Sequence, residues 1–89
     1  MASKIELSPQ ALKSLSQLDK QVGRRILQFL HEKIASLDDP RSIGEALKGS
    51  KLGEFWKYRV GDYRIIVSIE DNQVIVYVVR IGNRRDVYR

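Results

Sequence analysis

The chain has 89 residues, of which 43% are hydrophobic and 30% charged, and its formal net charge is +5. A chain of this length has room for one domain with one core, and this composition excludes a disordered protein. The absence of cysteine excludes disulfides and thiolate metal sites, and the sequence contains no apolar run of the length of a membrane span or a secretory signal. We therefore expect a single cytoplasmic domain over residues 1–89.

The first 40 residues predict a strand followed by a helical hairpin. Residues 4–8 alternate, with Ile5 and Leu7 on one side, as in a half-buried strand. Ser8 and Pro9 are typical of a helix start, and Asp19 is a candidate cap for a second helix after a tight turn. Apolar residues then recur at helical spacing in two stripes. The first contains Ala11, Leu12, Leu15 and Leu18, and the second Val22, Ile26, Phe29, Leu30, Ile34 and Leu37, with Lys33 as its one polar member.

After the second helix the sequence changes to the period of β-strands. Proline at position 40 ends that helix, because the residue before a proline disfavours the helical conformation. Residues 41–53 are predicted to form a connecting loop, with a helical turn at Gly44–Leu47. Three strands are expected at Phe55–Val60, Tyr63–Ile69 and Val74–Ile81, joined by turns at Gly61-Asp62 and Asp71-Asn72.

These elements predict an α+β fold of the order β-α-α-β-β-β. A small antiparallel β-sheet carries the N-terminal α-hairpin on one face, and the other face is left open. The last strand carries apolar residues on both of its faces, so we expect both faces to be covered, by the chain or by a partner. Val74, Val76 and Val78 are the residues predicted to contact that partner.

Positive charge is concentrated in the strand-rich part. Residues 41–89 hold ten Lys and Arg against six Asp and Glu, whereas residues 1–40 hold six against five. Strand alternation places Lys57 and Arg59 together on one face, and Arg64 follows just across a two-residue turn. Ammonium and guanidinium groups bind phosphate, so the pattern indicates a polyanionic partner such as nucleic acid. Further cationic or phenolic groups follow the last strand at Arg84, Arg85 and Tyr88.

Simpler interpretations exist for these residues. Lys57 and Arg59 are also suited to protecting an exposed sheet face from aggregation, and Arg64 to an ion pair with Asp62. The convergence of three segments on one open face favours a binding site. His31 lies on the polar side of the second helix, and with one histidine and no cysteine we expect no metal site and no cofactor.

Three blocks of the sequence, LSPQALKSLSQLDK, LKGSKLGEFWKYRVGDYRIIVSI and IGNRRDVY, resemble the RelE toxins of bacterial type II toxin–antitoxin pairs. The resemblance implies a ribosome-dependent endonuclease that cuts the mRNA codon in the decoding site and is controlled by a RelB-like antitoxin. It further implies that the toxin–antitoxin complex binds its operator DNA through the antitoxin. The family's active residues match Lys57, Arg59, Arg64, Arg84 and Tyr88, and contacts to RNA or the ribosome are expected from Arg85, Arg80, Lys48 and Lys51.

The proposed chemistry leaves one assignment open. RNA cleavage without a metal uses the 2′-hydroxyl as nucleophile, which requires a base, stabilisation of the phosphorane and protonation of the leaving oxygen. Arg59 replaces a lysine of the best-studied relatives, and because arginine does not exchange a proton near neutral pH it is expected to stabilise charge. Lys57 and Tyr88 remain alternative bases. Two rival functions are a ParE-like toxin that binds DNA gyrase without cutting RNA, and a plain RNA-binding module.

Overall fold

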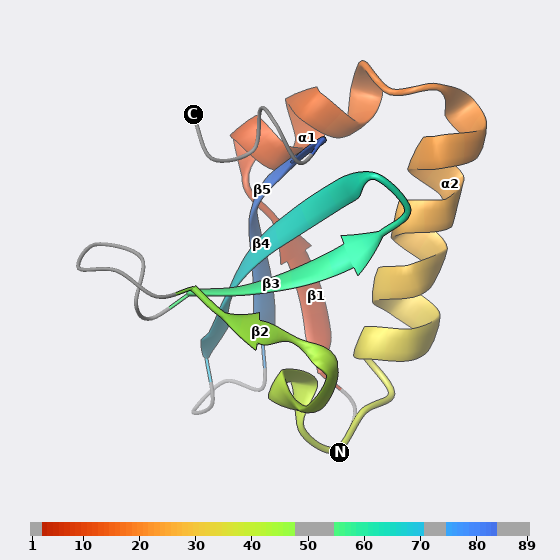
Figure 1. Cartoon of the computed structure of the whole chain (residues 1–89). Helices are drawn as coiled ribbons and strands as arrows, with labels where there is room; N and C mark the ends of the chain where they lie inside the picture. The colour runs from red at the N-terminus through yellow and green to blue at the C-terminus, as the bar shows by residue number, and fades with distance from the viewer. Residues whose placement is uncertain (1–2, 48–54, 71–74, 84–89) are drawn as a thin grey trace.

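A computed structural model describes residues 3–47, 55–70 and 75–83. Within these residues two α-helices lie on one side of a five-stranded sheet (Figure 1). The α+β class and the expected order of elements are confirmed, with one additional short strand. The elements are β1 (Lys4–Leu7), α1 (Pro9–Ser16), α2 (Lys20–Gln28), β2 (Glu45–Ala46), β3 (Phe55–Val60), β4 (Tyr63–Glu70) and β5 (Ile75–Asn83).

The strand order is β1-β5-β4-β3-β2, and not all neighbours are antiparallel. Strands β3, β4 and β5 pair antiparallel in chain order, as expected, and the additional β2 pairs antiparallel with β3, but β1 pairs parallel with β5. The prediction of a purely antiparallel sheet was therefore wrong at this edge. The helical hairpin, which follows β1, is long enough to act as part of the crossover that parallel neighbours require.

The segment before β3 also differs from expectation. The helical turn predicted at Gly44–Leu47 is a short strand instead, in which Glu45 pairs with Lys57 and the Leu47 N–H donates to the Phe55 carbonyl at 2.9 Å. A turn of 3₁₀ helix is present a few residues earlier, at Pro40–Ile43, where the Asp39 side chain caps it. Proline suits the first position of such a turn because it has no N–H to leave unpaired.

Both predicted helix caps are confirmed. The Ser8 Oγ accepts a hydrogen bond from the Ala11 N–H at 3.0 Å, and the Asp19 carboxylate accepts one from the Gln21 N–H at 2.9 Å. The Ser8 hydroxyl also donates to the Val79 carbonyl of β5 at 2.8 Å. One serine therefore both starts α1 and joins it to the sheet.

The second helix continues beyond α2 as a π-helical segment, Phe29–Ile34, in which the Ala35 N–H donates to the Leu30 carbonyl at 2.9 Å. Its inward side chains are fully buried, whereas Lys33, which the sequence placed in the apolar stripe, is exposed. The Lys33 Nζ lies 6.0 Å from the centre of the Phe29 ring. The wider turn of a π-helix thus keeps the lysine out of the core.

The core lies between the helices and the sheet face that they cover. Val76 and Val78 of β5 are 0% exposed there, packed in the same cluster as Ile26 and Leu30. The prediction that a partner covers these valines was wrong, because the chain's own helices already do so. Val74, the third valine of that prediction, lies outside the described residues. Among the residues that the structure describes, no helix is long and apolar enough to cross a membrane.

Candidate nucleic-acid interface

Strand register decides which of the predicted site residues face the same side of the sheet. Lys57 of β3 pairs with Ile66 of β4, and Ile66 pairs with Arg80 of β5. Directly paired residues point to the same face, so Lys57 and Arg80 lie in one row.

A second row runs parallel to the first, in which Arg59 pairs with Arg64 and Arg64 with Gly82. These two rows, called the cationic rows below, lie on the face opposite the helices, since the intervening Tyr58 and Ile65 are in the core. The structure therefore brings together Lys57, Arg59, Arg64 and Arg80, as the strand period predicted for the first three.

Lys57 is paired with an acidic residue that the sequence did not single out. Its Nζ lies 3.5 Å from Oε2 of Glu45 in β2, and the lysine side chain is 28% exposed whereas that of Glu45 is 70% exposed. The ion pair holds the lysine head beside β2 on the open face. Glu45 was missed because a strand of two residues is too short to show any alternation.

Arg64 is the most constrained of the four cations. It is 9% exposed, and its Nη1 donates to the Gly61 carbonyl at 3.2 Å and to the Tyr63 carbonyl at 3.1 Å. The two carbonyls hold the guanidinium at the β3–β4 turn, where Gly61 has a φ of 59° that favours glycine. Arg59, directly opposite in the register, is exposed. The pair thus combines one fixed and one adaptable guanidinium.

A small cavity lies among these groups. Its volume is about 50 Å³, enough for a few water-sized atoms such as phosphate oxygens. It is lined by Ile43, Glu45, Lys57, Tyr58, Arg59 and Arg64.

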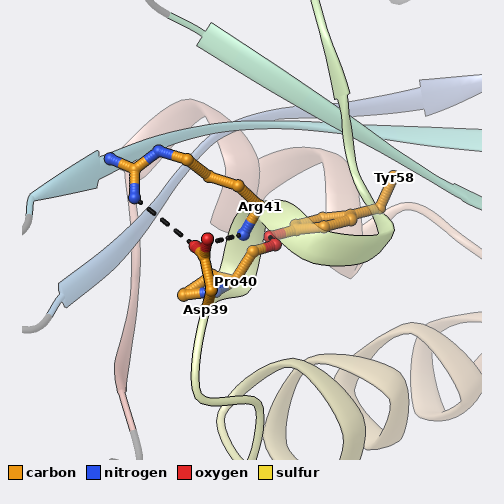
Figure 2. Close-up of polar contacts among 4 residues, drawn as sticks. All are labelled: Asp39, Pro40, Arg41 and Tyr58. Carbon is orange, nitrogen blue, oxygen red and sulfur yellow. Dashed lines mark hydrogen bonds and ion pairs between the residues drawn. The ribbon is translucent and has the colours of Figure 1, made fainter.

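Tyr58 anchors the segment that carries Glu45. Its Oη donates to the buried Pro40 carbonyl at 2.6 Å, as Figure 2 shows, and its ring meets that of Phe29 edge-on at 5.8 Å between centroids. Burial raises the pKa of Tyr58 to about 12, with a lowering contribution from Arg41 and a raising one from Asp39. The phenol therefore stays protonated and keeps donating near neutral pH.

The two residues beside Pro40 complete this anchor (Figure 2). The Asp39 Oδ1 accepts a hydrogen bond from the Arg41 N–H at 3.0 Å and lies 3.5 Å from the Arg41 Nη1. The Arg41 guanidinium carbon is in turn 5.9 Å from the centre of the Trp56 ring. Residues 39–41 are thereby fixed to β3 from the helix-covered side, and β2 follows directly.

The remaining predicted site residues are not placed by the structure. Within the described ranges, no three acidic or histidine side chains converge as metal ligands, and His31 lies on the exposed side of the π-helical segment. Arg84, Arg85, Tyr88, Lys48 and Lys51 lie outside the described residues.

Comparison with known proteins identifies the family. The model of a family described as the ParE toxin of the type II toxin–antitoxin system, parDE, matches residues 5–88. A putative RelE-like toxin protein of Escherichia coli is 30% identical over 90 residues, which cover 99% of this chain and 92% of the relative. The toxin RelG of Mycobacterium tuberculosis is 25% identical over 85 residues, covering 96% and 94%.

The fold is similar to that of solved toxins. The crystal structure of the toxin–antitoxin complex RelBE2 from Mycobacterium tuberculosis matches with a TM-score of 0.85 at 21% identity, covering 97% of this chain and 95% of that chain. The match of the family model over nearly the whole sequence, together with these relatives, shows that the chain belongs to the RelE/ParE superfamily of toxins of type II toxin–antitoxin systems.

Proposed function

We propose that this toxin is a ribosome-dependent endonuclease that cuts mRNA at the codon in the decoding site and so inhibits translation. The observation that carries the proposal is the pair of cationic rows, in which Lys57, Arg59, Arg64 and Arg80 from three strands share the open face of the sheet. Guanidinium and ammonium groups arranged in this way suit a phosphate backbone. The names of the RelE-like relatives support the same assignment.

The proposed reaction is attack by a ribose 2′-oxygen on the adjacent phosphorus. The P–O5′ bond breaks as the new bond forms, which leaves a 2′,3′-cyclic phosphate and a 5′-hydroxyl. Arg59 and Arg64 stabilise the negative charge of the phosphorane, a role that needs cationic donors and no proton exchange. Arg84 is proposed to assist the departing oxygen.

The base that removes the 2′-proton is proposed to be Tyr88. Its rival is Lys57, whose Nζ already lies 3.5 Å from the Glu45 Oε2, and this ion pair suits a charge-stabilising role. A single-turnover rate that does not change between pH 6 and 9 contradicts the assignment of either residue as the base. If Tyr88 is the base, Tyr88→Phe removes a rise of rate with pH that Lys57→Arg leaves in place.

Dependence on the ribosome follows from how little acid–base chemistry these residues offer. Arginine is a poor acid, and among the described residues the site has no histidine or carboxylate pair for acid–base catalysis, so much of the rate must come from holding the 2′-oxygen in line with the scissile bond. Orientation of reacting groups supplies on the order of 7–11 kcal/mol. A ribosome that holds the codon in an extended form is proposed to provide that orientation, with contacts from Arg80, Arg85, Lys48 and Lys51.

Control is proposed to come from a RelB-like antitoxin in the cytoplasm, by analogy with the M. tuberculosis complex. The toxin–antitoxin complex is proposed to bind its operator DNA through the antitoxin. Because Val76 and Val78 are buried by the chain itself, the antitoxin must contact other residues.

The test is translation in a purified system, with mapping of cut sites and of the end groups. Wild-type toxin is expected to give cuts in ribosome-bound mRNA with cyclic-phosphate ends. Arg59→Ala is expected to reduce the cutting rate by 100-fold or more, the usual effect of removing one such charge-stabilising group. The control Arg24→Ala removes another exposed arginine, from α2, and leaves the rate unchanged. Arg64→Lys tests the second guanidinium while keeping a positive charge beside the turn.

One outcome favours the rival function. The matching family model is that of ParE toxins, and a ParE-like toxin inhibits DNA gyrase without cutting RNA. Growth arrest that persists undiminished in the Arg59→Ala, Arg64→Lys double variant, without mRNA cuts by the wild type, refutes the nuclease and favours gyrase as the target. Salt-dependent RNA binding without cuts or arrest favours a plain binding module.

A further inference from the structure

A row of aromatic side chains lies beside the cationic rows on the same open face. Phe55 of β3 pairs with Ser68 of β4, and Ser68 pairs with Tyr77 of β5. Phe55 is two residues from Lys57 along β3, so this aromatic row is the immediate neighbour of the first cationic row. Both rings are half-buried and neither belongs to the core cluster between the helices and the sheet.

Packing holds the Phe55 ring in place, and both rings stay partly exposed. Phe55 packs against Leu47 and Ile66, a small cluster on the open face that is separate from the main core. Ser68, between the rings, is small, and its Oγ hydrogen-bonds to Glu70 at 3.3 Å. The rings are carried by β3 and β5, whose backbones are about 10 Å apart because β4 lies between them.

Charge is distributed unequally across this face. Two carboxylates and one lysine lie beside and beyond the aromatic row. Glu6 of β1 pairs with Tyr77, and its Oε1 lies 3.4 Å from the Nζ of Lys4. Glu70 of β4 pairs with Ile75. The four cations of the cationic rows lie on its other side. Even with Glu45 counted among them, the cationic rows keep a net positive charge, whereas Lys4 offsets only one of the two carboxylates on the other side, so a polyanionic backbone is favoured on the side of the cationic rows.

We propose that Phe55 and Tyr77 form a stacking platform for two bases of single-stranded RNA whose phosphates lie along the cationic rows. The inference rests on the proposed function and adds to it the residues that contact the bases. Open sheet faces with exposed aromatic rings bind single-stranded RNA in this way, since every base has a face that stacks. The charge difference across the face places the phosphates on the side of the cationic rows and the bases on the aromatic row. Because β4 separates the two rings, each ring is assigned a different base.

The test compares two ten-nucleotide oligouridylates with 2′-O-methyl groups, which resist cleavage. One carries all its bases and the other has abasic sites at its four central positions. Binding is measured by fluorescence anisotropy at low salt for the wild type, Phe55→Leu, Tyr77→Leu and Phe55→Tyr. Leucine keeps the packing against Leu47 and Ile66 but removes the ring. Tyr63→Leu is the matched control, because Tyr63 is a half-buried aromatic residue of β4 on the helix-covered face.

Each leucine substitution is expected to weaken binding of the complete oligonucleotide about tenfold, within the range for loss of one stacked base. Binding of the abasic oligonucleotide is expected to change less than twofold. Phe55→Tyr is expected to bind like the wild type, and Tyr63→Leu to affect neither oligonucleotide. Urea unfolding, followed by the fluorescence of Trp56, establishes that each variant is folded. If Phe55→Leu does not fold, the proposal is tested by Tyr77→Leu.

Several results overturn the platform. Equal losses on both oligonucleotides show that the rings only support the fold, and no loss on either shows that they contact no base. If the substitutions weaken only neutralisation by an acidic antitoxin peptide, the row is a protein-docking surface. In each case mRNA cutting by the wild type in the translation assay leaves the proposed function standing. A wild type that cuts no mRNA yet shows the base-dependent losses retains the platform and loses the nuclease.

Discussion

Tyr58→Phe isolates one buried hydrogen bond that fixes the approach to the candidate site. The substitution keeps the ring against Phe29 and removes only the hydroxyl that donates to the Pro40 carbonyl at 2.6 Å. The buried carbonyl then has no phenol donor, which is expected to lower the free energy of unfolding by about 1–3 kcal/mol. With a urea m-value of about 1.5 kcal/mol/M for a domain of this size, the unfolding midpoint falls by roughly 1 M.

The same residue predicts how this difference changes with pH. Burial raises the pKa of Tyr58 from 10.0 to about 12, so the folded chain holds the phenolic proton more tightly than the unfolded chain. The stabilisation is complete below pH 10 and is lost as the pH rises toward 12. A difference of two units corresponds to about 2–3 kcal/mol. The stability difference between the wild type and Tyr58→Phe is therefore expected to shrink by that order between pH 10 and 12.

The assay is urea unfolding of both proteins at several pH values, followed by the fluorescence of Trp56, the only tryptophan of the chain. Comparing the two proteins removes the contribution of other lysines and tyrosines, which titrate in the same range in both. A stability difference that stays constant from pH 9 to 12 refutes the reasoning, because the folded state then has no preference for the protonated phenol. Equal stability at pH 7 refutes the hydrogen bond's contribution.

Three further substitutions test other parts of the fold, each by urea or thermal unfolding. Ser8→Ala removes the α1 cap and the hydrogen bond to the Val79 carbonyl, and the free energy of unfolding is expected to fall by about 1–2 kcal/mol. Ser8→Thr keeps a hydroxyl and is the control, so equal stability of the two variants contradicts this prediction. Gly61→Ala is expected to lose about 1–2 kcal/mol because φ is 59° there, although the added methyl meets no atom within 4 Å, and an unchanged midpoint shows that the turn relaxes. Val76→Glu places a carboxylate in a position that is 0% exposed and is expected to unfold the chain, as circular dichroism would show; a folded variant means that the helices do not seal this face.

The helices and the long strands were predictable from the sequence, whereas the two-residue strand β2 was not. Periodicity identified the helices and the three long strands, and cap chemistry identified Ser8 and Asp19, since these signals are local. The strand β2 has two residues, and its pairing depends on contacts with β3 that no local pattern reveals. The parallel pairing of β1 with β5 was missed for the same reason, because alternation gives the faces of a strand but not its neighbours.

The candidate site was predictable to the same extent. The strand period placed Lys57, Arg59 and Arg64 on one face, and the register confirms it. Glu45 was missed together with β2. The error over Val76 and Val78 arose because a strand that is apolar on both sides was taken to need a partner. The helices bury one side, and Tyr77 lies half-buried on the other.

The pairing of β1 with β5 also governs when the toxin can fold. The Ser8 hydroxyl, just after β1, and the Val79 carbonyl, in the middle of β5, are 71 residues apart in sequence. Contacts of such separation form late, because most of the loop-closure entropy must be lost first. During synthesis α1 and β1 therefore emerge with no sheet to pack against, and β4 lacks one neighbour until β5 has left the ribosome. The nascent chain is thus without a completed open face, and without the β5 members of the cationic rows, until β5 has been synthesised.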